Sequence, residues 1–254
     1  MSVKRNQRNV VEDRWAKKAE EGKVIQEKFR EVRAVPPLQA KTNAQKQYLR
    51  YLKECKISIA SGHAGCGKSF CAAYYAAQML NAGEIDTIYI TRPYQHLGKD
   101  YGATPGDDYE KLLPFCRPTL DTIRGVLGDG NFNYCIEKGK IEIAPLEKIQ
   151  GRSFDEDCVI IADEIQCATK PQVLSLVTRL GEGVKFLAIC GDPRQAVTRD
   201  ENALEWITAF FERNAIEGVG VTYFTEDDCV RSGIVRDILI AFEREGGFYN
   251  TLEK

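Results

Sequence analysis

The 254-residue chain has 43% hydrophobic and 28% charged residues and a formal net charge of -2. This balance excludes a protein that is basic all over, so a nucleic acid would have to bind a local patch, and no apolar run approaches the roughly 20 residues needed to cross a bilayer. The nine cysteines lack C-x-x-C spacing and there are only two histidines, which argues against structural zinc or a disulfide framework and favours the reducing cytoplasm.

The first 37 residues form a basic arm with a linker. Residues 1–35 carry ten Lys or Arg against six Asp or Glu, and the pattern predicts a polar helix over about 11–33. Pro36 and Pro37 mark the linker. Two interpretations remain open, a solvated arm that contacts another subunit or an arm that touches nucleic acid. Residues 38–254 are predicted to be one domain.

The rest of the chain alternates between strand and helix patterns. Six apolar segments rich in β-branched residues are predicted strands: 56–61, 87–91, 141–144, 158–163, 186–192 and 221–224. Helices are predicted over 68–81, 109–127, 171–180, 202–213 and 231–244. Near-continuous apolar strands between helices predict an α/β fold of three layers, with a mostly parallel sheet covered on both faces. Such sheets bind ligands beyond the carboxyl ends of their strands.

A phosphate-binding motif follows the first strand. Gly62 to Ser69 read G-H-A-G-C-G-K-S, which matches G-x-x-x-x-G-K-[ST] between a strand and a helix. The glycines let backbone N–H groups point at phosphate oxygens, and the helix amino end adds partial positive charge. Lys68 is expected to reach the β and γ phosphates, and Ser69 to offer an oxygen to Mg²⁺. The alternative is a glycine turn that only starts a helix.

Two acidic residues end the strand at 158–163. Asp163 suits a magnesium contact, and Glu164 suits the activation of an attacking water. A kinase must exclude water, so this acid favours hydrolysis over phosphate transfer to an acceptor. The alternative is that both acids are favoured only by the dipole of a following helix.

Glutamine residues supply two further candidates. Gln195 follows the strand at 186–192, close to Asp192, and its amide can bond both a γ-phosphate oxygen and the attacking water. Gln45, in "KTNAQKQY", has an amide that can bond adenine through a donor and an acceptor. From its chemistry alone, a glutamine such as Gln45 is more often an ordinary surface residue.

Taken together, these segments resemble the PhoH family of P-loop ATPases, whose core is similar to the first RecA-like domain of superfamily 1 helicases. The resemblance covers about 41–245 and depends on several strings in one order. They are "KTNAQKQY", "GHAGCGKS", "ITRPYQHLGKDYGATPGDDYEKLLPFCRP", "IEIAPLEKIQGRSF", "VIIADEIQ", "LVTRLGEGVKFLAICGDPRQ" and "YFTEDDCVRSGIVRDILIAFE".

The resemblance implies roles for these residues. Gln45 becomes the adenine contact, Asp163 and Glu164 the second acidic motif, and Gln195 the γ-phosphate sensor. The implied Mg·ATP site comprises Gln45, Gly62, His63, Ala64, Gly65, Cys66, Gly67, Lys68, Ser69 and Phe70. Thr91 and Arg92, in "ITRP", resemble the helicase-type motif that faces single-stranded RNA or DNA, although Arg92 is also consistent with a salt-bridged arginine at a strand end.

The resemblance also implies a ring-shaped homo-oligomer, for which six subunits are expected. In such rings one subunit can offer an arginine to its neighbour's nucleotide. Arg231 is the first candidate, and Arg117 and Arg152 are its rivals. The planar, permanently charged guanidinium suits oxygens that gain charge as the γ-phosphoryl group leaves.

The sequence departs from the family at two places. His63 stands where proline is common, at a position expected to make no contact, and "AVTRDENAL" replaces the usual continuation after Gln195. No second RecA-like half is expected, which argues against an unaided unwinding motor. The favoured function is an ATPase coupled to single-stranded nucleic acid. The alternatives are a nucleotide-gated switch that recruits a protein and, less favoured, a kinase.

Overall fold

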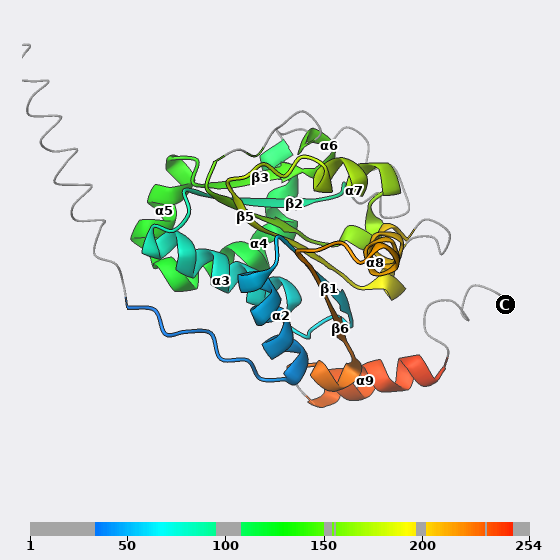
Figure 1. Cartoon of the computed structure of the whole chain (residues 1–254). Helices are drawn as coiled ribbons and strands as arrows, with labels where there is room; N and C mark the ends of the chain where they lie inside the picture. The colour runs from blue at the N-terminus through cyan, green and yellow to red at the C-terminus, as the bar shows by residue number, and fades with distance from the viewer. Residues whose placement is uncertain are drawn as a thin grey trace, which may run out of the picture. The chain divides into compact units, whose positions relative to one another are not determined.

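The computed structural model describes residues 34–94, 108–149, 154, 156–196, 202–231 and 233–245. Residues 36–254 form one compact unit, and the description below concerns this unit (Figure 1). The predicted helix over 11–33 and the candidate Arg152 lie outside the described residues.

A parallel sheet of six strands forms the centre of the unit, in the order β3-β2-β4-β5-β1-β6. The strands are β1 (Ile57–Gly62), β2 (Thr87–Arg92), β3 (Ile141–Pro145), β4 (Cys158–Ala162), β5 (Val184–Gly191) and β6 (Val219–Phe224). All six predicted strands are present within two residues at each end, and the predicted α/β fold with a parallel sheet is confirmed.

Helices precede, connect and follow the strands. They are α2 (Asn43–Glu54), α3 (Lys68–Ala82), α4 (Asp108–Leu127), α5 (Asp129–Glu137), α6 (Leu146–Ile149), α7 (Lys170–Val177), α8 (Ala203–Asn214) and α9 (Gly233–Arg244). Short 3₁₀ turns follow three strands: η1 (Ile165–Cys167), η2 (Pro193–Gln195) and η3 (Glu226–Asp228). In the described part of the chain, no helix is both long enough and apolar enough to cross a membrane.

Three helices were not predicted, namely α2, α5 and α6. Helix α2 begins at Thr42, whose side chain accepts a hydrogen bond from the backbone N–H of Gln45. It buries Gln45, Tyr48 and Leu52, which are spaced three and four residues apart. This spacing is a helical signal that can be found in the sequence. Because Gln45 is buried, it is not an ordinary surface residue.

The core is built on both faces of the sheet. One face carries Ile59, Ile160 and Leu187, which pack in a cluster with side chains of α7 and α8. The other face is covered by α3 and α4, as Figure 1 shows. Helix α3 contributes four alanines with no exposed surface, so it lies close to the sheet: Ala72, Ala73, Ala76 and Ala77.

The strand order places three strand ends beside one another. Strand β5 lies between β1 and β4, and all three run in the same direction. The segments that follow them, which begin at His63, Asp163 and Asp192, therefore meet at one edge of the sheet.

Candidate functional site

The phosphate loop between β1 and α3 is held by its own backbone and by neighbouring segments. Gly62 has φ of +138°, and a Cβ atom there would lie 1.9 Å from the Phe224 carbonyl oxygen, so only glycine fits. The Lys68 ammonium donates to the carbonyl oxygens of Gly62 at 2.7 Å and His63 at 2.6 Å. Lys68 is 8% exposed, and the loop therefore holds this cation where it lines the cavity.

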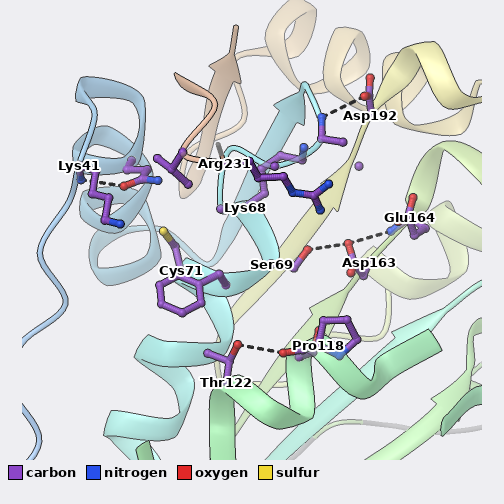
Figure 2. Close-up of a pocket in the computed structure, with 18 of the residues that line it drawn as sticks. Lys41, Lys68, Ser69, Cys71, Pro118, Thr122, Asp163, Glu164, Asp192 and Arg231 are labelled. Atoms are coloured by element: carbon purple, nitrogen blue, oxygen red, sulfur yellow. Dashed lines mark hydrogen bonds between the residues drawn. The ribbon is translucent and has the colours of Figure 1, made fainter. Parts of the chain in front are cut away.

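A direct contact joins the loop to the acids after β4. The Ser69 hydroxyl donates to Asp163 Oδ1 at 2.7 Å, and the Glu164 backbone N–H donates to the same oxygen at 3.1 Å (Figure 2). Burial raises the pKa of the Asp163 carboxyl group, as does the nearby charge of Glu164, while the Ser69 hydrogen bond and Arg92 lower it.

The oxygens of Ser69 and Asp163 are the kind of ligand that Mg²⁺ prefers. Among the described residues, no group of three or more His, Cys, Asp or Glu side chains could hold a metal ion. A magnesium ion here would therefore need oxygens from another source, and Mg²⁺ typically takes them from substrate phosphates and water.

Glu164 adopts an unusual backbone conformation and is held in place. Its φ of +57° lies in the left-handed region, which is uncommon for residues other than glycine and often occurs at functional sites. Its carboxylate accepts a hydrogen bond of 2.6 Å from the Gln166 amide. Gln166 is 2% exposed, and its amide oxygen accepts from the Asp192 backbone N–H at 3.2 Å. Gln166 therefore links the ends of β4 and β5, a role that the sequence analysis missed.

Asp192 is the centre of a second hydrogen-bond network at the site. Its Oδ2 atom accepts from the Ala64 backbone N–H at 3.2 Å and from the Gln195 amide at 3.0 Å. Arg194 forms a two-pronged ion pair with the same carboxylate, at 2.9 and 2.8 Å. Asp192 thus ties the phosphate loop to the turn that carries Gln195.

Gln45 reaches the phosphate loop from α2. Its amide nitrogen donates to the Cys66 carbonyl oxygen at 3.0 Å, and its amide oxygen accepts from the Lys41 backbone N–H at 2.8 Å. These two partners fix which end of the amide is the donor. One N–H and one oxygen lone pair stay available for a ligand.

The arginine candidates occupy different places. Arg231 and Arg117 are both exposed, but Arg231 lines the cavity and Arg117, on α4, does not. Arg92 also lines the cavity but is 7% exposed; its guanidinium donates to the Phe115 carbonyl oxygen at 2.9 Å and lies 5.2 Å from the centre of the Phe115 ring. Thr91 is fully buried, and its carbonyl oxygen accepts from the Asp163 backbone N–H.

These residues surround a cavity of about 620 Å³. The predicted site residues that line it are Gln45, Ala64, Gly65, Gly67, Lys68, Ser69, Phe70, Arg92, Asp163, Glu164, Gln195 and Arg231. Figure 2 shows Lys68, Ser69, Asp163, Glu164 and Asp192 around the same space. The predicted residues that do not line it are Gly62, His63, Cys66 and Thr91.

His63 does not line the cavity but makes contacts within the protein. The His63 Nε2 atom lies 3.3 Å from Glu226 Oε2, and the His63 backbone N–H donates to the Phe224 carbonyl oxygen. The side chain therefore faces the segment after β6 instead of the cavity.

One wall of the cavity was not foreseen. It is formed by Phe115, Pro118, Thr119 and Thr122 of α4. At the other end, Leu38, Gln39 and Lys41 contribute from the segment before α2. None of these residues was predicted to line the site, because the packing of α4 against α3 and β3 is what places its side chains there.

Comparisons with known proteins agree with this arrangement. The family model described as "PhoH-like protein" matches residues 37–243. The chain is 37% identical over 220 residues to Protein PhoH of Escherichia coli (strain K12), an alignment that covers 84% of this chain and 60% of that protein. It is 34% identical over 209 residues to a PhoH-like protein of Bacillus subtilis (strain 168), covering 82% of this chain and 65% of that one.

A solved structure supports the fold. The large terminase from a thermophilic bacteriophage superposes with a TM-score of 0.50 at 14% identity, over 79% of this chain and 50% of that one. The chain thus spans between half and two thirds of the length of these three proteins. The sheet is parallel, with a phosphate loop after β1 and acids after β4, and the family model matches most of the chain. We conclude that this chain belongs to the PhoH family.

Proposed function

We propose that this protein binds Mg·ATP in the cavity and hydrolyses it to ADP and phosphate. The observation that carries the proposal is the contact of 2.7 Å between the Ser69 hydroxyl and Asp163 Oδ1. It joins a phosphate loop to a buried acid from another strand, in the wall of a cavity large enough for a ligand. P-loop enzymes use this pair of groups at the magnesium ion of a bound nucleotide.

The cationic groups would hold the phosphates. The Lys68 ammonium now donates to two loop carbonyls, and a β or γ phosphate oxygen would replace part of this bonding. Ser69 and Asp163 would hold Mg²⁺, which, when bound, offsets the charge of the phosphate oxygens. Proton transfer and the contact with the γ phosphate are assigned to side chains of this chain.

Glu164 is the proposed general base. The oxygen of a water forms a bond to the γ-phosphorus as the bond to the bridging oxygen breaks, and ADP leaves with that electron pair. The proton of the water passes to the Glu164 carboxylate. The Gln166 hydrogen bond fixes the direction of this carboxylate, and Gln195, which lines the same cavity, is proposed to bond the γ phosphate.

Gln45 is proposed to select adenine over guanine. Its oriented amide can accept from the adenine amino group and donate to N7. Guanine would place a carbonyl oxygen against the Gln45 amide oxygen instead. Gln45→Ala should therefore lower the preference for ATP over GTP by about tenfold. Gln47→Ala, in the same helix, is the matched control, and an unchanged preference in Gln45→Ala would count against this role.

The partner of the ATPase is proposed to be single-stranded RNA or DNA, and the protein is proposed to act as a homo-oligomer of six subunits. The resemblance of Thr91 and Arg92 to a helicase-type motif supports the nucleic-acid part of this proposal. Thr91 and Arg92 end β2 at the edge of the sheet where the cavity opens, and Arg92 lines the cavity. A nucleic-acid strand that bound beyond Arg92 would act on the cavity through the contact of Arg92 with Phe115 in the cavity wall.

A second candidate function is a nucleotide-gated switch that recruits another protein and hydrolyses ATP slowly. Helix α9 favours this alternative because it exposes Ile234 and Ile238, at 69% and 60%. These side chains are one helical turn apart and follow Arg231 closely in the chain. Exposed apolar side chains that adjoin each other are a common feature of protein interfaces.

Phosphate release with and without homopolymeric RNA and single-stranded DNA tests the proposal. Lys68→Ala and Glu164→Gln should both abolish release, whereas the exposed controls Lys185→Ala and Glu54→Gln should retain it. Stimulation by a polymer supports the coupled ATPase. Slow release that responds to a protein partner instead supports the switch, and a wild-type protein without any release contradicts the hydrolytic function.

A further inference from the structure

The segment after β6 crosses the phosphate loop and is bonded to it. The Phe224 carbonyl oxygen accepts from the His63 backbone N–H at 3.3 Å, and the Thr225 carbonyl oxygen accepts from the Cys66 thiol at 3.3 Å. Further along, the Val230 backbone N–H donates to the Gly65 carbonyl oxygen at 3.2 Å. Bonds at both ends of this segment therefore fix the position of the next residue, Arg231, relative to the loop.

Arg231 occupies the space that a side chain at position 65 would need. A Cβ atom on Gly65 would lie 2.8 Å from Arg231 Cδ and 3.0 Å from Nε. A distance of 2.8 Å is shorter than real Cβ contacts show, so the arginine could keep this position only if position 65 has no side chain. Figure 2 shows Arg231 beside Lys68 at the cavity; Arg231 lies in the segment between η3 and α9 of the same chain.

Within the described part of the chain, no carboxylate forms an ion pair with Arg231. By contrast, Arg194 and Arg236 are paired with Asp192 and Asp227. A guanidinium that lines a cavity beside Lys68 without a counter-ion is suited to an anionic ligand, because its fork of N–H donors matches phosphate oxygens.

We propose that Arg231 contacts the terminal phosphate of the nucleotide bound in its own subunit, so that each subunit carries a complete set of cationic groups. The inference rests on the proposed binding of ATP. It differs from the expectation that the ring supplies this arginine from a neighbouring subunit. The reason is geometric: the arginine stem already packs on the phosphate loop of its own chain, over Gly65.

Nucleotide affinities test the contact with the terminal phosphate. Arg231→Ala should weaken binding of a non-hydrolysable ATP analogue by about tenfold or more and leave ADP binding unchanged, because only the former has the third phosphate. Arg117→Ala, which removes an arginine outside the cavity, should change neither affinity. An unchanged ratio of the two affinities in Arg231→Ala overturns the proposed contact.

Mixed assemblies test whether the arginine acts within its own subunit. Arg231→Ala and Lys68→Ala chains are co-expressed with different tags and purified through both tags. Nucleotide then binds only to subunits that lack Arg231. If the arginine acts in its own subunit, the ratio of the affinity for the ATP analogue to the affinity for ADP stays as low as in Arg231→Ala alone. If a neighbour supplies it, about half of these subunits should regain the wild-type ratio, which would overturn the proposal.

The same samples separate this inference from the proposed function. Wild-type protein that releases no phosphate contradicts hydrolysis, while the affinity ratios still decide the role of Arg231. Wild-type protein that is active, together with mixed assemblies that regain the ratio, contradicts only the assignment of Arg231 to its own subunit. If the two tags do not purify together, each chain acts alone, and a lowered ratio in Arg231→Ala then supports the proposal directly.

Discussion

Removal of the Asp192 carboxylate should be among the most destabilising single changes at the site. This side chain is 6% exposed and pairs with Arg194, whose side chain is 25% exposed. It also accepts from the Ala64 backbone N–H and the Gln195 amide. In Asp192→Ala the Ala64 backbone N–H and the Gln195 amide lose this acceptor, and the Arg194 guanidinium loses this carboxylate.

The size of the effect follows from this burial. Removing one partner of a buried ion pair costs about 3–5 kcal/mol. Because Arg194 is partly exposed, water can solvate it in the variant, and a loss near the lower end, about 3 kcal/mol, is expected. For a domain of this size, that loss corresponds to a fall in the unfolding midpoint of about 6–12 °C.

Thermal unfolding of matched variants gives the measurement. The control is Asp157→Ala, which breaks an ion pair of 2.7 Å with Lys185 whose side chains are 53% and 41% exposed. Such surface pairs contribute about 0–1 kcal/mol. Urea titrations with unchanged slopes would show that both changes act on stability alone. If Asp192→Ala lowers the midpoint no more than Asp157→Ala does, the reasoning from burial is refuted.

Three further outcomes are expected. In Gly191→Ala the new Cβ would lie 2.3 Å from Gln166 Oε1, so urea titration should show a free energy of unfolding lowered by about 1–3 kcal/mol. The control Gly125→Ala, where the new Cβ has nothing within 4 Å, should be neutral or slightly stabilising. Equal effects of the two changes would contradict this reasoning. Burial raises the pKa of Asp163, so the stability from this group is present at acid pH and is lost as the pH rises through the folded-state pKa. Asp163→Asn should therefore raise the unfolding midpoint of the nucleotide-free protein at neutral pH while abolishing Mg²⁺-dependent nucleotide binding, and an unchanged or lower midpoint would show that desolvation does not dominate. Thr169→Ala removes the cap of α7 and should cost about 1 kcal/mol in thermal unfolding, and a loss of a few tenths or less would mean that the cap is replaced by water.

Local patterns were enough for most of the fold. The β-branched strands and the helix that starts at Lys68 each depend on neighbours in sequence, and the structure contains them where they were predicted. Helix α2 was not predicted because only three of its residues are buried, which leaves few apolar positions from which a helical period can be recognised. The wall of α4 was missed for another reason, since the residue types of Phe115 and Thr119 indicate no ligand chemistry and the packing of α4 places them at the cavity.

Local sequence signals predict that a phosphate loop and a pair of acids follow two parallel strands, because each signal lies within a few consecutive residues. Which of these groups meet depends on the packing of the whole domain. Ser69 and Asp163 are 94 residues apart in the chain, and Ala64 and Asp192 are 128 apart. The strand order brings them together, since parallel strands end at a common edge. The same reason applies to Arg231, whose position over Gly65 results from the pairing of β6 with β1.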